Sequence, residues 1–322
     1  MEKPNVLFIL ADDLGWADST PYGSTFYETP NIARLARRGM KFTICHTSSP
    51  VCSPSRASIL TGLYAERLGM TQPAGHIAEI HLAAALPEKA RRDQKLLQPR
   101  SVTRLNTIYP TLGRSLLAGG YRTAHFGKWH LGDDPYSPLQ HGFELDVPHW
   151  NGHGPNRSYF GPSKYGESFV TAEGEHIEER MTREAVRFIG ENKHRPFFLN
   201  YWAFSVHSPF FAKTELLEKY RHKAASLPHN AGQRNPLYAA MVETFDHAVG
   251  ALLDALEQHG IADRTIVVFT SDNGGIDRPG YTGEKAWGNG TEAELRQIPV
   301  TSNAPLAGGK GTIHDGGTAV PL

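Results

Sequence analysis

The stretch that decides the fold runs from residue 5 to residue 13 and reads NVLFILADD. It begins with a short, almost continuous apolar run, which is typical of a strand covered on both faces within a parallel sheet. The run predicts a strand over residues 5–10, and two acidic residues, Asp12 and Asp13, follow it closely. The chain therefore opens with a buried strand that ends in two carboxylates.

A second stretch is built in the same way. It reads TIVVFTSDNGG over residues 265–275 and predicts a buried strand over residues 265–270. Asp272 and Asn273 follow the end of this strand. Polar oxygen donors thus stand at the carboxyl ends of two predicted strands that are far apart in the sequence.

Helical patterns and further apolar runs alternate between these two strands. Predicted strands cover residues 41–46, 121–126 and 196–205, and predicted helices cover residues 30–38, 111–117, 175–192 and 236–259. Such alternation predicts an α/β fold with a large, mostly parallel sheet flanked by helices. Ligand chemistry is then expected beyond the carboxyl ends of the strands.

Three long stretches interrupt the alternation. Residues 74–106, 133–174 and 276–307 are rich in Gly, Pro, His and polar residues. Loops of this length in a compact domain are usually functional or mobile. We expect them to line a substrate cleft, with Trp150, Trp202, Trp287, His76, His81, His149 and His153 as candidate lining residues, although Trp202 falls inside a predicted strand.

Length and charge narrow the class of protein. The chain has 322 residues, of which 39% are apolar and 20% charged, a balance typical of a globular protein. Because 33 basic residues equal 33 acidic ones, no overall basic field attracts nucleic acid. The longest apolar runs have the length of strands, so no membrane span is predicted.

The N-terminus and the cysteines leave the cellular location open. The first residues show no charged segment followed by an apolar one, so no signal peptide is visible. A periplasmic or extracellular location would require a signal peptide outside this sequence. The chain has two cysteines, Cys45 and Cys52, too few for a disulfide framework.

The two acidic strand ends form a candidate metal site. Asp12, Asp13, Asp272 and Asn273 offer three carboxylates and an amide, and clustered oxygen donors suit a hard cation such as Ca²⁺ or Mg²⁺. For either pair alone, helix capping or turn formation explains the residues equally well. Two such pairs at two strand ends favour the metal.

The stretch VCSPSRASILTG, residues 51–62, is the most specific in the chain. Ser53 is a good N-cap and Pro54 suits a first helical position, so Cys52 is predicted just before a helix N-terminus, where unpaired N–H groups favour anions. The alternatives are an inert buried cysteine and a disulfide between Cys45 and Cys52.

These motifs together resemble the formylglycine-dependent sulfatase family of the alkaline phosphatase superfamily. The pattern C-x-P-S-R followed by LTG, over residues 52–62, resembles the family's signature, and FGKWHLG, residues 126–132, resembles its second signature. Other matching motifs are the two acidic strand ends, the segment starting at His207, and Gly-Lys-Gly around Lys310. The resemblance extends from residue 5 to the end of the chain.

The resemblance implies a nucleophile and a metal. In this family a maturation enzyme oxidises the cysteine that matches Cys52 to Cα-formylglycine, whose hydrated aldehyde attacks sulfur. Asp12, Asp13, Asp272 and Asn273, together with residue 52, would hold Ca²⁺, with Mg²⁺ as the alternative.

The resemblance also assigns roles to five further residues. Lys128 and Lys310 would hold the sulfate oxygens, and Arg56 would orient the hydrated aldehyde. His207 would protonate the leaving oxygen, and His130 would remove a proton so that sulfate is released and the aldehyde re-forms.

Family members usually continue into a C-terminal subdomain, so residues 1–322 are expected to be the sulfatase catalytic domain without it. The expected substrate is a sulfated glycan, with a small aryl sulfate as the alternative. Two other functions stay open: hydrolysis of a phosphate or phosphonate ester, and non-catalytic binding of sulfated glycans.

Overall fold

A five-stranded sheet forms the centre of the computed structural model, which describes residues 3–90, 92–166, 169–228, 231–280 and 288–322. The strand order is β3-β2-β6-β1-β7, and every pairing in this sheet is parallel. The strands are β1 (Asn5–Ala11), β2 (Arg122–Gly127), β3 (Leu145–Val147), β6 (Phe197–Trp202) and β7 (Thr265–Ser271). The predicted α/β class is confirmed.

The register of the sheet brings the two acidic strand ends together. Along β1, Leu7 lies beside Leu199 of β6 and Val267 of β7. At the end of β1, Ala11 lies beside Ser271, and the backbone N–H of Asp272 donates to the Ala11 carbonyl oxygen at 3.2 Å. The residues that come after β1 and β7 therefore emerge side by side at one edge of the sheet.

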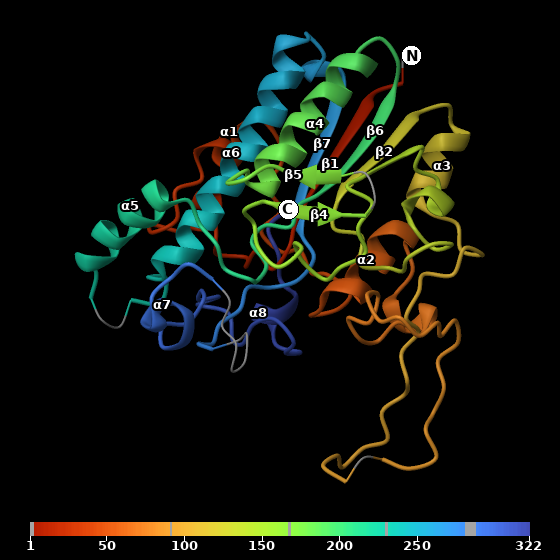
Figure 1. Cartoon of the computed structure of the whole chain (residues 1–322), viewed down its shortest axis with the longest axis horizontal. Helices are drawn as coiled ribbons and strands as arrows, with labels where there is room; N and C mark the ends of the chain where they lie inside the picture. Colours follow the sequence, from red (N-terminus) through yellow and green to blue (C-terminus); the bar gives the residue numbers. More distant parts are fainter. Residues whose placement is uncertain (1–2, 91, 167–168, 229–230, 281–287) are drawn as a thin grey trace.

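Helices cover both faces of the sheet because alternate residues of β1 point to opposite sides. Leu7 and Ile9 belong to the core that contains α4 (Ile177–Asn192) and α6 (Pro236–Gln258), while Phe8 and Leu10 belong to the core beneath α2 (Cys52–Thr61). Figure 1 shows α6 and α3 (Leu112–Ala118) on opposite sides of the strands. The buried strands are thus part of a three-layer arrangement.

The remaining elements are short or peripheral. They are α1 (Pro30–Arg38), α5 (Thr214–Ala225), α7 (Glu292–Arg296), α8 (Asp315–Thr318), the antiparallel pair β4 (Ser163–Tyr165) and β5 (Phe169–Thr171), and four 3₁₀ turns, η1 (Thr20–Tyr22), η2 (Ala65–Leu68), η3 (Pro138–His141) and η4 (Ala262–Arg264). Within the described ranges, no helix is both long and apolar enough to cross a bilayer.

Two parts of the chain differ from the sequence-based expectations. Residues 41–46 do not form a strand: they contribute one isolated bridge, between His46 and Ala319, and the side chain of Ile44 is largely exposed. The strand prediction was wrong there because the segment runs past the last residues of the chain instead of joining the sheet. The Phe42 N–H, for example, donates to the Leu322 carbonyl oxygen. Helix α5 was not predicted, because its charged sequence has only a weak apolar face.

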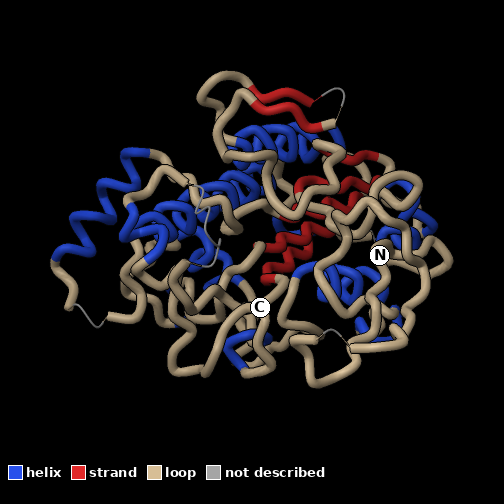
Figure 2. The backbone as a smooth tube through the Cα atoms, turned by 60° about the horizontal axis from the view of Figure 1, so that its bottom comes forward, coloured by secondary structure: helices blue, strands red, loops and turns tan. Residues whose placement is uncertain are grey.

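Loops cover the end of the molecule where the strands terminate, as Figure 2 shows with that end turned forward. The orange segment at the bottom of Figure 1 projects furthest from it, and nearly all of its residues over 77–90 and 92–100 are exposed. Its two arms are joined by a bridge between Ala85 and Arg100. The ends of the strands thus lie behind a border of long loops.

Candidate active site

Four polar residues at the ends of β1 and β7 form the floor of the candidate site. Asp12, Asp13, Asp272 and Asn273 are fully buried. The backbone N–H of Asp13 donates to Asp272 Oδ1 at 3.2 Å, and Asn273 Nδ2 donates to Asp13 Oδ1 at 2.8 Å. The two strand ends are therefore bonded to each other.

The floor has the chemistry of a cation site. Asn273 Oδ1 is buried and has no hydrogen-bond partner among the described residues, so one strong acceptor is left over. Burial raises the pKa of Asp12 to about 8 despite the nearby Lys128, and the neighbouring Asp272 and Asp13 carboxylates add to the increase. A divalent cation would satisfy the unpaired oxygen and relieve the repulsion between carboxylates. Hard oxygen donors of this kind suit Ca²⁺ or Mg²⁺.

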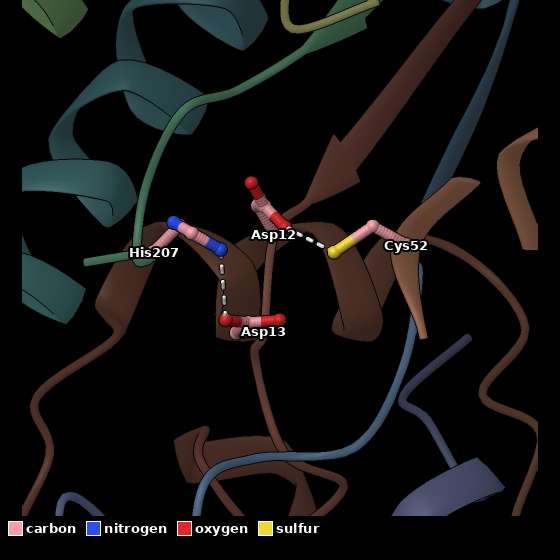
Figure 3. A group of neighbouring side chains, drawn as sticks. All are labelled: Asp12, Asp13, Cys52 and His207. Carbon is pink, nitrogen blue, oxygen red and sulfur yellow. Dashed lines mark hydrogen bonds and ion pairs between the residues drawn. The ribbon is translucent and has the colours of Figure 1, made fainter. Parts of the chain in front are cut away.

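Cys52 faces this floor from the N-terminus of α2. Its Sγ lies 3.6 Å from Asp12 Oδ1, and Figure 3 shows the two side chains pointing toward each other. Ligand atoms of Asp12, Asp13, Cys52 and His207 all lie within 4.8 Å of one another. The sequence motif and the acidic strand ends thus meet in space.

The start of α2 differs in detail from the prediction. The helix begins at Cys52 itself with Val51 as N-cap, and Ser53 Oγ donates to the His130 carbonyl oxygen at 2.8 Å instead of capping the helix. Cys45 and Cys52 are both free thiols, so the structure contains no disulfide between them. Burial raises the pKa of the Cys52 thiol to about 12, which makes the unmodified side chain a poor nucleophile at neutral pH.

Each of the three floor carboxylates is paired with a buried cation: Lys128, Lys310 or Arg56. Lys128 Nζ lies 2.6 Å from Asp12 Oδ2, and Lys310 Nζ lies 2.6 Å from Asp13 Oδ2. Burial alone would raise the pKa of Asp13, but Lys310 and His207 outweigh burial and hold it below its ordinary value. Both lysines therefore point to the same small volume at the strand ends.

Arg56 connects the floor to the second signature. Its Nε donates to Asp272 Oδ2 at 2.8 Å, and its Nη1 donates to the Lys128 carbonyl oxygen at 2.7 Å. The guanidinium carbon also lies 5.1 Å from the centre of the Trp202 ring. Trp202 is fully buried and belongs to the core under the site, so it does not line the cleft.

Two buried histidines stand beside the floor. His207 Nε2 lies 3.7 Å from Asp13 Oδ2, while its Nδ1 donates to the Ser208 carbonyl oxygen at 2.6 Å. His130 Nε2 lies 2.8 Å from His76 Nδ1. Burial, reinforced by Lys128, holds the pKa of both buried imidazoles well below the ordinary value, so each is neutral and able to accept a proton.

An open cleft of about 760 Å³ leads from the floor to solvent. Cys52, His130, His207 and Lys310 line its inner part, and Val51, Pro73, His76, Trp150, Gly152, His153, Gly154, Pro155, Asn156, Arg157, Ser208 and Pro209 also line it. The cleft thus reaches from the strand ends to two of the three long loops that the sequence suggested would line it.

The candidate lining residues fall into three groups. His76, His153 and Trp150 line the cleft as expected. His81 and His149 do not, and His149 Nδ1 instead bonds to Asp146 Oδ2 at 2.7 Å. Trp287 lies outside the described residues.

The sequence did not point to Arg157, because one arginine in a Gly- and Pro-rich loop gives no recognisable signal.

The chain is similar to known sulfatases over almost its whole length. The family model described as Sulfatase matches residues 4–322. N-acetylgalactosamine-6-sulfatase of Homo sapiens is 31% identical over 347 residues, which cover 99% of this chain and 56% of that protein. Arylsulfatase A of Bos taurus is 32% identical, over 99% of this chain and 58% of its own length.

A solved structure agrees with these relatives. The crystal structure of Ps i-CgsB in complex with k-i-k-neocarrahexaose superimposes with a TM-score of 0.73 at 29% identity, covering 99% of this chain and 65% of that one. The chain therefore spans little more than half the length of the two sulfatases that it matches in sequence.

Proposed function

The chain belongs to the sulfatase family, and from this premise we propose that it hydrolyses a sulfate ester to an alcohol and inorganic sulfate. One observation carries the proposal: the side chain of residue 52 faces three buried carboxylates and an unpaired amide oxygen at the bottom of an open cleft. Residues 1–322 would form the catalytic domain.

Residue 52 is the proposed nucleophile after modification. A formylglycine-generating maturation enzyme would convert the Cys52 side chain to an aldehyde, whose hydrate supplies an oxygen nucleophile. The high pKa of the buried thiol supports this, because an unmodified cysteine would stay protonated at neutral pH. The N-terminus of α2, where residue 52 lies, favours a negatively charged group.

Asp12, Asp13, Asp272 and Asn273, with residue 52, are the proposed ligands of a divalent cation, Ca²⁺ with Mg²⁺ as the alternative. When bound, such an ion polarises a sulfate oxygen and increases the acidity of a neighbouring hydroxyl. The unpaired Asn273 Oδ1 and the raised pKa of Asp12 support this assignment.

Lys128 and Lys310 are the proposed sulfate clamp. Each ammonium lies 2.6 Å from a carboxylate of the floor, so the two converge on one volume beside residue 52. Preorganised cations stabilise charge that develops on the sulfate oxygens without reorganising during the reaction. Arg56, fixed at both ends of its guanidinium, would orient the oxygens at residue 52.

The two buried histidines would move the protons. His207 presents Nε2 to the floor because its Nδ1 donates to the Ser208 carbonyl oxygen, so Nε2 is the atom that would first take up a proton and then pass it to the leaving oxygen. His130 would accept a proton from an oxygen at residue 52. The exposed His76, bonded to His130, would connect this buried imidazole to solvent.

A sulfated carbohydrate is the proposed substrate. The cleft has the volume of sites that bind small ligands and carries an aromatic side chain, Trp150, that suits a sugar ring. The structurally similar Ps i-CgsB was solved in complex with k-i-k-neocarrahexaose, and one relative is named for a sulfated amino sugar. Sulfate monoesters of small aryl alcohols are the second candidate.

The proposal is tested by comparing matched esters. The protein is produced together with a formylglycine-generating enzyme and assayed on 4-nitrophenyl sulfate, 4-nitrophenyl phosphate and a phenyl phosphonate ester, and on a set of sugar sulfates. We expect release of inorganic sulfate, with phosphate and phosphonate turnover at least about tenfold slower. Faster phosphate or phosphonate turnover would favour the other hydrolase class.

Mass spectrometry of the peptide that contains residue 52 separates the enzyme from a binding protein. Conversion to the aldehyde accompanied by sulfate release supports the sulfatase. A plain thiol at position 52 in a host with the maturation system, together with tight glycan binding, would support the non-catalytic alternative.

A further inference from the structure

The cationic side chains that line the cleft differ in how they are neutralised. Among the described residues, the lysine and arginine side chains that line the cleft are Lys310 and Arg157. No carboxylate belongs to the lining within these ranges. Lys310 is paired with Asp13 on the floor. Arg157 is exposed, and among the residues that the structure describes its side chain has no hydrogen bond or ion pair. Arg157 is thus a cation in the cleft wall without a counter-charge.

The backbone around Arg157 is held in place. Asn156 N–H donates to the Tyr165 hydroxyl at 3.2 Å, and Asn156 Nδ2 donates to the Lys164 carbonyl oxygen at 2.7 Å. Arg157 has φ = 67°, in the left-handed region that residues other than glycine seldom adopt. Such conformations cluster at ligand sites. The turn therefore presents Arg157 from a fixed position.

The wall beside Arg157 suits a sugar ring. Trp150 lines the same cleft, and its Nε1 donates to the Gly154 carbonyl oxygen at 2.8 Å, which fixes the indole. The cleft, at about 760 Å³, is far larger than a sulfate group needs. A substrate whose sulfate reaches residue 52 therefore has room for further groups along the wall.

We infer that Arg157 is a subsite for a second anionic group, a sulfate or a carboxylate, on the same glycan whose first sulfate reaches residue 52. The inference rests on the proposed sulfatase function and adds a substrate class, glycans with at least two negative charges. A guanidinium binds either oxyanion through two parallel N–H donors, which lysine cannot reproduce.

The test compares substrates that carry one anionic group with substrates that carry two. The wild-type chain, Arg157→Gln and Arg157→Lys are assayed on glucosamine 6-sulfate, on glucosamine 2-N,6-O-disulfate, and on a disaccharide of glucosamine 6-sulfate with a uronic acid. 4-Nitrophenyl sulfate reports the basal activity. Lys164→Gln is the matched control, because Lys164 is exposed on the neighbouring strand β4 and does not line the cleft.

We expect Arg157→Gln to raise KM about 3–5-fold for the doubly charged compounds and to leave it nearly unchanged for the singly charged ones, since an exposed ion pair has a modest effect. Arg157→Lys should recover part of the loss, and Lys164→Gln should behave as wild type. A larger effect on the disulfate assigns the second anion as sulfate, and a larger effect on the uronic acid disaccharide assigns it as carboxylate.

The outcomes separate the inference from the proposed function. If sulfate is released but Arg157→Gln changes all substrates equally, or Lys164→Gln has the same effect, the subsite is wrong and the sulfatase stands. If the wild-type chain releases no sulfate from any ester, the sulfatase proposal fails. Calorimetric binding of the same sugar sulfates then decides the subsite, because Arg157→Gln should still weaken binding of the doubly charged sugars alone.

Discussion

The floor and the wall of the cleft are built differently. The floor consists of fully buried residues at the ends of β1 and β7, namely Asp12, Asp13, Asp272 and Asn273, bonded to each other and to buried cations. The wall consists of loop residues such as His76 and Arg157, which are exposed. In the proposed enzyme, the sheet would fix the chemistry of the site and the loops would select its substrate.

The two regions are joined at a few points. Asn151 Nδ2 donates to the Gly75 carbonyl oxygen at 2.8 Å, and Gly132 N–H donates to Asn151 Oδ1 at 3.1 Å. These bonds tie both wall loops to the segment that carries His130. The wall loops are therefore positioned by the segment that carries His130, and changes in the buried floor should have the larger effects.

The largest effect is expected from removing the nucleophile. Cys52→Ala should lower sulfate release by at least about 10⁴-fold, as loss of a covalent nucleophile does in other hydrolases. Initial rates on 4-nitrophenyl sulfate measure it. Cys45→Ala, which removes the other free cysteine, serves as control and should keep activity. Equal activity of the two variants would show that residue 52 takes no part in the chemistry.

The second effect concerns the cation. In excess Ca²⁺ the wild-type chain should be more stable than in a chelator, by about 2.7 kcal/mol at a concentration of 100 times Kd. Asn273→Ala should lose most of this difference, because Asn273 supplies the unpaired floor oxygen. Thermal melting of both proteins in Ca²⁺ and in chelator provides the measurement. A wild-type Tm that does not respond to Ca²⁺ or Mg²⁺ would contradict the metal site.

The third effect is a pH dependence of the unfolding free energy, which we expect from the buried carboxyl group of Glu178 near the site. Glu178 is buried under the segment that leads to His207, where its Oε1 accepts from Phe204 N–H at 3.0 Å. Burial raises its pKa from 4.5 to about 7. A raised folded-state pKa means that its stabilising contribution is present below pH 4.5 and is lost as pH rises through 7.

Glu178→Gln should remove that pH dependence, because the amide does not titrate. Relative to the variant, the wild type should lose about 2–3 kcal/mol of unfolding free energy between about pH 5 and pH 8. Denaturant unfolding of both proteins at the two pH values measures the difference. The same pH dependence in both would mean that Glu178 titrates near its ordinary value.

The smallest effect concerns His76, a wall residue that contacts His130 beside the floor. His76→Ala should lower kcat about tenfold and shift the pH profile of kcat, because His130 loses its link to solvent. His81→Ala is the matched control, since His81 lies on the same loop but outside the cleft lining. If the two variants gave the same rate and pH profile, His76 would have no role through His130.

The contrast between floor and wall also explains which parts of the structure could be predicted from the sequence. The strand ends could be predicted because continuous apolar runs identify buried parallel strands. Parallel strands place the residues after their carboxyl ends at one edge of the sheet. That reasoning brought Asp12, Asp13, Asp272 and Asn273 together, and the structure places them in contact. Cys52 was found through its motif and was placed within one residue of its position in α2.

The wall could not be predicted for a physical reason. The position of a loop depends on tertiary hydrogen bonds, such as that from Asn156 N–H to the Tyr165 hydroxyl, which have no periodicity in the sequence. Arg157 was therefore missed, and His149 and His81 were assigned to the cleft wrongly. The false strand at residues 41–46 has a similar cause, because an extended apolar pattern does not specify a partner.

The central claim is that the ends of β1 and β7 hold a divalent cation in front of residue 52. A crystal structure of the chain grown in Ca²⁺ tests this most directly. We predict anomalous density for one ion coordinated by Asp12, Asp13, Asp272 and Asn273 Oδ1, with residue 52 beside it. An ion bound elsewhere, or a floor in which Lys128 and Lys310 keep their carboxylate partners and no ion enters, would contradict it.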